Sequence, residues 1–337
     1  MKNNPELLDD YISSPITVVD VGSDGGVHEI EGLAPYCSVH AFEPRQKSYE
    51  ALVNGNKSLV VYDGKNYGNI SYYKYALAKS EGIYDLYVTK IPQASSLLEP
   101  DLDVARSVRG EDDETLVVEG REKVNAITLN KFVEITGLDW VDYIKLDTQG
   151  TELDILKGAG DFIKKISVIR MEVEFVKLYK NQPLFDDCVS YLNDKGFRFL
   201  DLQEIATTNN DRKGKKVWGE AFFINTDVCP TEECAIKKAL VLIELGYNHE
   251  ARWMLSRSNI DIQRYKNFME LTIEIFYGRK SKHMYSLIKS YQKFNSKRKE
   301  NGKRPFNLSW IRKIIGMLPF GRSILEAVQG RSLDKMR

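Results

Sequence analysis

Cysteine and histidine are both scarce in this chain of 337 residues, which holds four of each. The cysteines, at positions 37, 188, 229 and 234, show no Cys-x-x-Cys spacing, and no histidine stands near the last two in a zinc-knuckle arrangement. A zinc module and a disulfide framework are therefore not expected. Because no cysteine falls near a predicted strand end, a cysteine nucleophile is not expected either. Idle thiols in a reducing compartment fit this pattern.

Long apolar runs are also missing. No segment approaches the roughly 18 apolar residues that a membrane-spanning helix needs. The first residues, MKNNPELLDDYISSP, lack the apolar core of a signal peptide. We therefore expect a cytoplasmic protein.

A net charge of zero conceals an uneven distribution. Residues 229–337 hold 22 Lys and Arg against 10 Asp and Glu, whereas residues 1–228 hold 26 against 38. The composition changes at the same point, since apolar residues recur at intervals of three and four after Cys229, as in paired helices. We therefore predict two parts: a catalytic domain over 1–228 and a basic α-helical extension over 229–337.

Within the first part, short β-branched runs alternate with helical segments. Five runs predict buried strands, at residues 16–22, 38–44, 72–78, 141–150 and 166–175. Two more runs, at 196–202 and 220–226, predict closing strands with an antiparallel edge. Strands separated by helices favour parallel pairing, so the fold class is α/β with a doubly wound, mostly parallel seven-stranded sheet. The charged stretch 108–123 predicts a hairpin that could act as a lid.

Ligands of such sheets bind at the carboxyl ends of the strands. The first strand ends in Asp20 and continues as Gly22-Ser23-Asp24-Gly25-Gly26. This is not the Gly-x-Gly-x-x-Gly pattern of dinucleotide binding, and the carboxylate of Asp20 would repel a pyrophosphate. We expect Asp20, Gly22, Ser23, Asp24 and Gly25 to contact a cationic ligand, with a simple strand-to-helix turn as the alternative.

Glu43 ends the second strand in the sequence AFEP, 21 residues after Gly22. An acidic side chain at this place typically binds a ribose diol. Together with the glycine turn it predicts S-adenosylmethionine as the cofactor, with Glu43 and Pro44 at the ribose. Ala76 and Leu77 are added to this predicted site from their position alone.

Two longer motifs give a family resemblance. The sequence IKLDTQGTELDILKGA (144–159) resembles a signature of the FkbM family of S-adenosylmethionine-dependent methyltransferases. The segment MEVEFVKLYKNQPLFDDCVSYLNDKGF (171–197) is similar to the same family, and so is SSLLEP (95–100). The likeness covers residues 15–228 and implies a Rossmann-like methyltransferase fold. It also implies O-methylation of a hydroxyl on a sugar, glycan or related metabolite. It says nothing about the basic extension.

Methyl transfer to an alcohol needs a base or a metal to assist the hydroxyl. Asp147, Glu172 and Glu174 stand at neighbouring strand ends, so we expect them to converge as a carboxylate base or as ligands of Mg²⁺ or Mn²⁺. A helix N-cap is the structural alternative for Asp147. For Glu152, a functional role in the site and a capping role in the first turn of the helix are equally favoured.

Three further residues are considered for the site. Tyr179 and Gln182, in LYKNQPLF, are expected to touch the substrate, although Tyr179 could simply pack. His28 follows the glycine turn, where a surface position is the favoured interpretation.

The basic extension allows three interpretations. Residues 278–304 interleave basic and aromatic side chains, and residues 308–328 form an amphipathic segment with Trp310. Such segments bind anionic membrane surfaces, which would place the protein at the inner face of a membrane. Packing on the acidic first part, in the same chain or in a homo-oligomer, explains the charge asymmetry more simply. Nucleic acid is disfavoured because no recognisable binding motif is present.

Three alternatives to a methyltransferase acting on a small hydroxylated acceptor remain open at this stage. The first is an inactive methyltransferase-like module that recruits a partner through the basic extension. The second is a nicotinamide-dependent dehydrogenase, against which Asp20 and the glycine spacing argue. The third, an RNA methyltransferase, would require the extension to bind RNA with strong salt dependence.

Overall fold

The computed structural model describes most of the chain. The described residues are 8, 10–22, 27–54, 67–207, 214–227, 229–258, 260, 261, 263–265, 267, 268, 271 and 272. The chain divides into two compact units, Ser14–Asp227 and Met1–Ser13 with Val228–Arg337. Each unit is described here by itself.

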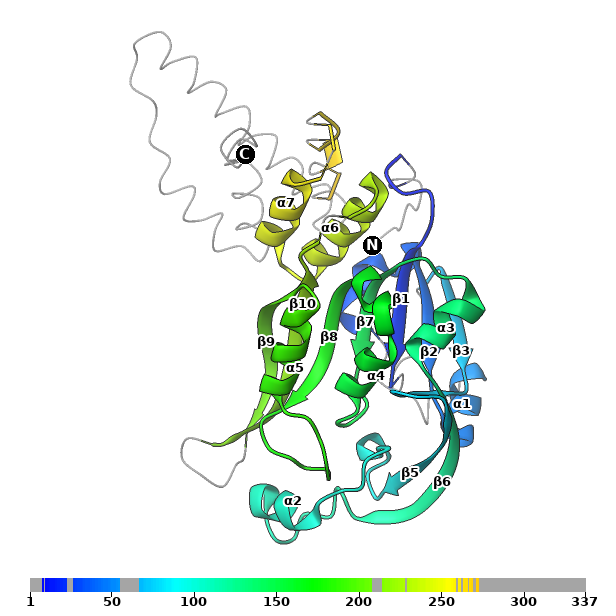
Figure 1. Cartoon of the computed structure of the whole chain (residues 1–337), viewed down its shortest axis with the longest axis vertical. Coiled ribbons are helices and arrows are strands. Elements are labelled where there is room, and N and C mark those ends of the chain that lie inside the picture. Colours follow the sequence, from blue (N-terminus) through cyan, green and yellow to red (C-terminus); the bar gives the residue numbers. More distant parts are fainter. Residues whose placement is uncertain are drawn as a thin grey trace. The chain divides into compact units, whose positions relative to one another are not determined.

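The larger unit is built on a seven-stranded sheet (Figure 1). Its strands, in spatial order, are β3 (Asn69–Tyr73), β2 (Cys37–Phe42), β1 (Ile16–Val21), β7 (Val141–Leu146), β8 (Ile166–Glu174), β10 (Lys216–Asn225) and β9 (Phe197–Thr207). The first five strands run parallel to one another, and β10 is antiparallel to both β8 and β9. The predicted doubly wound, mostly parallel sheet with an antiparallel edge is confirmed.

Burial explains why these runs are strands. All six residues of β7 are buried, and so are eight of the nine residues of β8. Parallel strands covered on both faces are buried along their length in this way and are largely apolar. One apolar cluster joins these strands to three helices, α3 (Leu129–Thr136), α4 (Glu152–Gly158) and α5 (Phe185–Asp194). In Figure 1, α4 and α5 lie across the face of β7, β8 and β10.

Local signals fix the helix ends. Thr128 precedes α3, and its hydroxyl accepts a hydrogen bond from the backbone N–H of Lys131 at 2.9 Å. Gly137 ends the helix with φ +70, a left-handed conformation that favours glycine. The remaining helical elements of this unit are η2 (His28–Tyr36), α1 (Gln46–Val53), η3 (Pro92–Ala94), α2 (Leu102–Arg109) and η4 (Gly160–Lys165).

A second, three-stranded sheet was not predicted. Its order is β4 (Ala76–Leu77), β6 (Val118–Ile127) and β5 (Gly82–Thr89). The predicted third strand, 72–78, is wrong as a single element, because β3 pairs with β2 whereas β4 pairs with β6. The hairpin predicted within 108–123 is also wrong. Residues 118 onward form β6, which pairs with residues of β5 that lie 29 to 44 positions earlier in the chain.

The smaller unit contains the predicted helix pair, α6 (Glu232–Glu244) and α7 (Asn248–Ser256). Thr231 caps α6 through its hydroxyl, which accepts from the N–H of Cys234 at 3.1 Å. Gly246, with φ +88, lies in the turn between the helices. The basic and amphipathic segments at 278–304 and 308–328 lie outside the described residues. Among the helices that are described, none has the length and apolar character to cross a membrane.

Candidate active site

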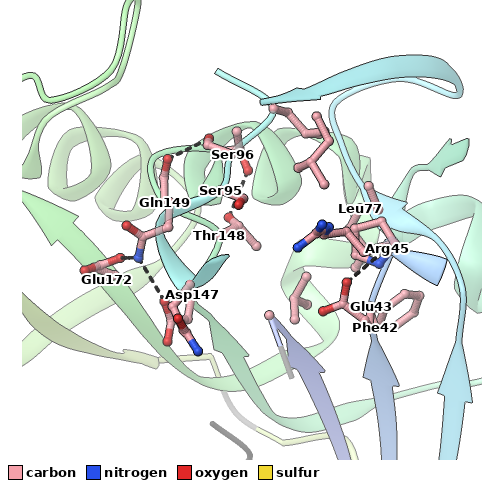
Figure 2. Close-up of a pocket in the computed structure, with 18 of the residues that line it drawn as sticks. Phe42, Glu43, Arg45, Leu77, Ser95, Ser96, Asp147, Thr148, Gln149 and Glu172 are labelled. Carbon is pink, nitrogen blue, oxygen red and sulfur yellow. Dashed lines mark hydrogen bonds between the residues drawn. The ribbon is translucent and has the colours of Figure 1, made fainter. Parts of the chain in front are cut away.

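A cavity of about 440 Å³ lies at the carboxyl ends of β1, β2 and β7. The chain runs outward from β1 to β2 and β3 on one side, and from β7 to β8 on the other. The cavity therefore occupies the switch point at which open α/β sheets bind ligands. The second sheet closes another wall with Ala76, Leu77 and Leu86. Figure 2 shows side chains from both sheets pointing into this space.

The predicted cofactor residues divide into three groups. Gly22, Glu43, Pro44, Ala76, Leu77 and Asp147 line the cavity. Asp20 does not line it. Ser23, Asp24 and Gly25 lie outside the described residues.

The glycine turn is packed tightly against the loop after β7. Gly22 has φ +85, and a Cβ at this position would clash with the carbonyl oxygen of Asp147. The backbone N–H of Asp147 donates in turn to the carbonyl of Val21 at 3.0 Å. Glycine at position 22 thus brings the backbones of two strand ends together at the floor of the cavity.

Asp20 is buried on β1, two residues before Gly22. Its side chain is 3% exposed and lies 3.6 Å from the ammonium of Lys145, which also donates to the Gly22 carbonyl at 3.3 Å. Burial raises the pKa of Asp20, while Lys145 opposes the rise. Burial would lower the pKa of Lys145, but the nearby Asp20 and Asp147 raise it above its ordinary value. The prediction of direct ligand contact by Asp20 is not supported, because its charge faces Lys145 beneath the turn.

Glu43 lies at the end of β2 with its carboxylate in the cavity. Its Oε1 accepts a hydrogen bond from the backbone N–H of Arg45 at 2.8 Å, which holds the carboxylate beside the loop. Figure 2 shows the Glu43 and Arg45 side chains pointing into the same part of the cavity. A carboxylate at this place in an open α/β sheet can accept hydrogen bonds from the hydroxyls of a diol.

The loop after β7 is strained. Gln149 has φ +59, a left-handed conformation that residues other than glycine rarely adopt. Its Nε2 donates to Oε2 of Glu172 at 2.6 Å and to Oδ1 of Asp147 at 3.4 Å. Its carbonyl accepts from the hydroxyl of Ser96 at 2.8 Å. One amide thus bridges the two carboxylates, and the surrounding contacts hold a strained residue in place, as functional sites often do.

Glu152 has a structural role. Its Oε1 accepts from the N–H and the hydroxyl of Thr148, at 2.6 and 2.9 Å, and its Oε2 accepts from the N–H of Gly150 at 2.9 Å. Burial raises the pKa of Glu152 to about 7 against these hydrogen bonds. The N-cap residue of α4 is Thr151, so the N-cap alternative for Asp147 is wrong. Asp147 is left to face the cavity.

Asp147 and Glu172 have contrasting environments. The Asp147 side chain is 35% exposed, and its Oδ2 lies 3.4 Å from the ammonium of Lys145. Glu172 is buried on β8, directly opposite Glu220 of β10. Burial, followed by repulsion from Asp147 and Glu174, raises the pKa of Glu172 well above its ordinary value. A buried carboxyl group beside a cavity-facing carboxylate forms a pair of the kind that takes part in proton transfer.

The predicted convergence of three carboxylates is only partly found. Glu174 is buried but does not line the cavity. In the described part of the chain, no group of three or more His, Cys, Asp or Glu side chains is placed to hold a metal ion. The donor set predicted for Mg²⁺ or Mn²⁺ is therefore not supported, because Glu174 does not line the cavity and Glu172 accepts a hydrogen bond from the Gln149 amide.

Tyr179 and Gln182 lie behind the cavity wall. The Tyr179 hydroxyl donates to the carbonyl of Ala94 at 2.7 Å and lies 3.3 Å from Oε1 of Gln149. Gln182 accepts from the N–H groups of Leu178 and Tyr179 at 2.7 and 3.1 Å. Since neither residue lines the cavity, their predicted substrate contact is not supported. They hold the Gln149 loop in place.

Several lining residues were missed by the sequence analysis. They come from the loops after β2 and β7, the segment after η3, strand β8 and the antiparallel edge, and include Arg45, Ser95, Ser96, Gln149, Arg170, Glu204, Trp218 and Glu220. The run DTQG was a usable signal for Gln149, because a polar residue stands beside the turn glycine. Ser95 and Ser96 stand in the SSLLEP motif, but that motif was not connected with the site. The other residues carry no local signal. His28 is exposed and does not line it.

Glu220 makes the stability of this unit depend on pH. Burial raises its pKa from 4.5 to about 7, although Arg170 lies 3.3 Å away and opposes the rise. Between these pH values the folded chain binds more protons than the unfolded chain, so the free energy of unfolding falls as pH rises. We expect Glu220→Gln to make that fall shallower, by at most about 1.4 kcal/mol per pH unit. Urea titrations from about pH 4.5 to about pH 7.5 measure the slope.

The exposed Glu119 of β6 provides the comparison for this test. Glu119→Gln removes one exposed carboxylate and leaves the buried carboxyl groups unchanged. Equal slopes in the Glu220→Gln chain and the wild type would show that Glu220 is not the group responsible.

Comparison with known proteins gives one family match. The family model described as the methyltransferase FkbM domain matches residues 25–199. No curated protein matches the chain. Among solved structures, magnesium protoporphyrin IX methyltransferase (ChlM) from Synechocystis, with bound SAM, is 10% identical. The comparison covers 66% of this chain and 76% of that one, with a TM-score of 0.32. TYW2 from M. jannaschii, in complex with AdoMet, is 16% identical over 67% and 78% of the two chains, with a TM-score of 0.26.

Proposed function

The chain belongs to the FkbM family of methyltransferases, and we propose that it transfers a methyl group from S-adenosylmethionine to a hydroxyl of a sugar, glycan or related metabolite. One observation carries this proposal. The glycine turn at Gly22, the carboxylate of Glu43 and the linked pair Asp147 and Glu172 all line one cavity at the switch point of the sheet.

The cavity wall fits the parts of the cofactor. Phe42, Pro44, Ala76, Leu77 and Leu86 supply an apolar surface suited to an adenine base. Glu43 lies at the end of β2, where a carboxylate accepts hydrogen bonds from both hydroxyls of a ribose. The Gly22 turn and Asp147 lie across the cavity, close to where the cationic sulfur and the amino-acid part would extend.

When bound, S-adenosylmethionine supplies a methyl group on a positively charged sulfur that also serves as the leaving group. The residues of this chain then have to align the acceptor and remove its proton. In this transfer the oxygen–carbon bond would form as the carbon–sulfur bond breaks, with its electron pair left on sulfur. The hydroxyl proton passes to the carboxyl pair, in which Asp147 orients the hydroxyl. Glu172, which the Gln149 amide holds beside Asp147, completes this pair.

The first experiment is a calorimetric titration of the full chain with S-adenosylhomocysteine, with and without EDTA. We expect clear binding in both conditions, and we expect Glu43→Ala to weaken it at least about tenfold, because two charge-assisted hydrogen bonds to the ribose are lost. Glu50→Ala, an exposed change on α1, is the matched control.

The outcomes separate the alternatives. Binding that EDTA abolishes would restore a role for a metal. If neither condition gives binding, the methyltransferase proposal fails and an inactive module that recruits a partner becomes the better interpretation. With binding established, sugar acceptors are screened by the release of S-adenosylhomocysteine.

A further inference from the structure

Arg45 is a cavity residue that neither the family match nor the proton-transfer chemistry explains. It follows Glu43 and Pro44 on the loop after β2 and serves as the N-cap residue of α1. Its side chain is 17% exposed and lines the cavity. An arginine that is largely buried in a ligand cavity needs a partner for its charge, and this partner comes from the second sheet.

The partner is Glu122, in the middle of β6. Nη2 of Arg45 donates to Oε1 of Glu122 at 2.8 Å, and Nε lies 3.3 Å from both carboxylate oxygens. Glu122 therefore holds one edge of the guanidinium. Nη1 makes no hydrogen bond within the described part of the chain, so that nitrogen and the flat face of the group are available to a ligand.

The surroundings of the guanidinium indicate which part of a ligand it meets. In Figure 2 the Arg45 guanidinium lies in the cavity near Glu43 and Leu77. The neighbouring lining residues Tyr75, Ala76 and Leu86 are apolar or aromatic. Glu43 offers its carboxylate to a diol next to this apolar wall. A flat cation beside such a wall is suited to the face of an aromatic base, since guanidinium groups stack on electron-rich rings.

We propose that Arg45 binds the adenosine part of the cofactor through the plane of its guanidinium, and that Glu122 is the positioning residue that fixes this plane. The assignment rests on the proposed function, because it takes the cavity to hold S-adenosylmethionine. In this assignment the second sheet takes part in cofactor binding. It supplies the apolar wall and, through Glu122, orients Arg45 on the loop after β2.

Calorimetry with two probes tests the assignment on the full chain. S-adenosylhomocysteine carries the nucleoside and the amino acid, whereas 5′-methylthioadenosine carries only the nucleoside. We expect Arg45→Met to weaken both probes by the same factor, about tenfold, because the plane and charge are lost while the aliphatic stem remains. Arg45→Lys should not restore affinity, since lysine has charge but no plane.

Glu122 is tested by a double-mutant cycle. If Glu122 acts through Arg45, Glu122→Gln weakens both probes by about threefold in the wild type and has no further effect in Arg45→Met. The matched control is Asp85→Asn, which removes the 2.8 Å ion pair between Asp85 and Lys123 on the same two strands. Neither Asp85 nor Lys123 lines the cavity, so both probes should bind this variant as they bind the wild type.

Three results would overturn the assignment, and they are distinguishable. Wild-type affinity in Arg45→Met removes the binding role of Arg45 and leaves the proposed function intact. A loss confined to S-adenosylhomocysteine means that Arg45 pairs with the amino-acid carboxylate and not with the base. Failure of the wild-type chain to bind either probe refutes the proposed function itself. Thermal unfolding of each variant confirms that the chains compared are folded.

Discussion

Asp147→Asn is expected to lower the turnover of methyl transfer about a hundredfold or more while S-adenosylhomocysteine still binds. The substitution keeps the shape of the side chain and the amide contact with Gln149, but it removes the negative charge that faces the cavity. Lys145 keeps Asp20 as a partner, so the turn below the cavity remains neutralised. Initial rates with an acceptor from the screen, together with calorimetry of S-adenosylhomocysteine, measure the two effects separately.

Glu174→Gln is the informative comparison for Asp147→Asn. Glu174 was grouped with Asp147 on sequence grounds, yet it is buried and does not line the cavity. Its pKa is raised well above the ordinary value, first by burial, so a neutral glutamine is a mild replacement. We expect a far smaller loss of turnover than for Asp147→Asn. Near-normal turnover in Asp147→Asn would remove Asp147 from the catalytic pair.

Gly22→Ala is expected to destabilise the larger unit by about 3 kcal/mol or more and to abolish cofactor binding. Two effects add at this position. An alanine at φ +85 is strained, and its Cβ would clash with the Asp147 carbonyl, so the ends of β1 and β7 must separate. Because both strand ends form the floor of the cavity, the damage reaches the ligand. Urea denaturation followed by tryptophan fluorescence measures the loss of stability.

Gly137→Ala isolates one of these two effects. Gly137 has φ +70, but a Cβ there would meet nothing within 4 Å. It lies at the end of α3, away from the cavity, so alanine introduces backbone strain without a clash. A cost of about 1 kcal/mol with normal S-adenosylhomocysteine binding is expected. If Gly22→Ala cost no more than Gly137→Ala, the close approach of the two strand ends would be unimportant.

The sequence alone determined those features that depend on neighbouring residues. Short runs rich in β-branched and other apolar residues identified β1, β7 and β8, since strands buried on both faces are largely apolar. The parallel order followed from the intervening helices. The rule that ligands bind at strand ends then selected Gly22, Glu43 and Asp147, all of which line the cavity.

Only the tertiary structure decided what each polar group does. Asp20 and Asp147 look alike in sequence, as carboxylates at the ends of strands. Lys145 lies next to both, but burial confines Asp20 to a charge pair beneath the turn, whereas Asp147 faces the cavity. Alternation along β8 placed Glu172 and Glu174 on one side of the strand, yet only Glu172 lines the cavity. Depth and partners are set by packing, which spacing along a chain does not encode.

The second sheet, which forms one wall of the cavity, was not predicted from the sequence. β5 and β6 pair across 29 to 44 residues of sequence, and Glu122 contacts Arg45 across 77 residues. Such contacts depend on which strand edges meet, and that choice is made by the whole chain as it folds, after local propensities have been satisfied. The sequence therefore determined the frame and the strand ends of the site, and tertiary pairing determined the residues that enclose it.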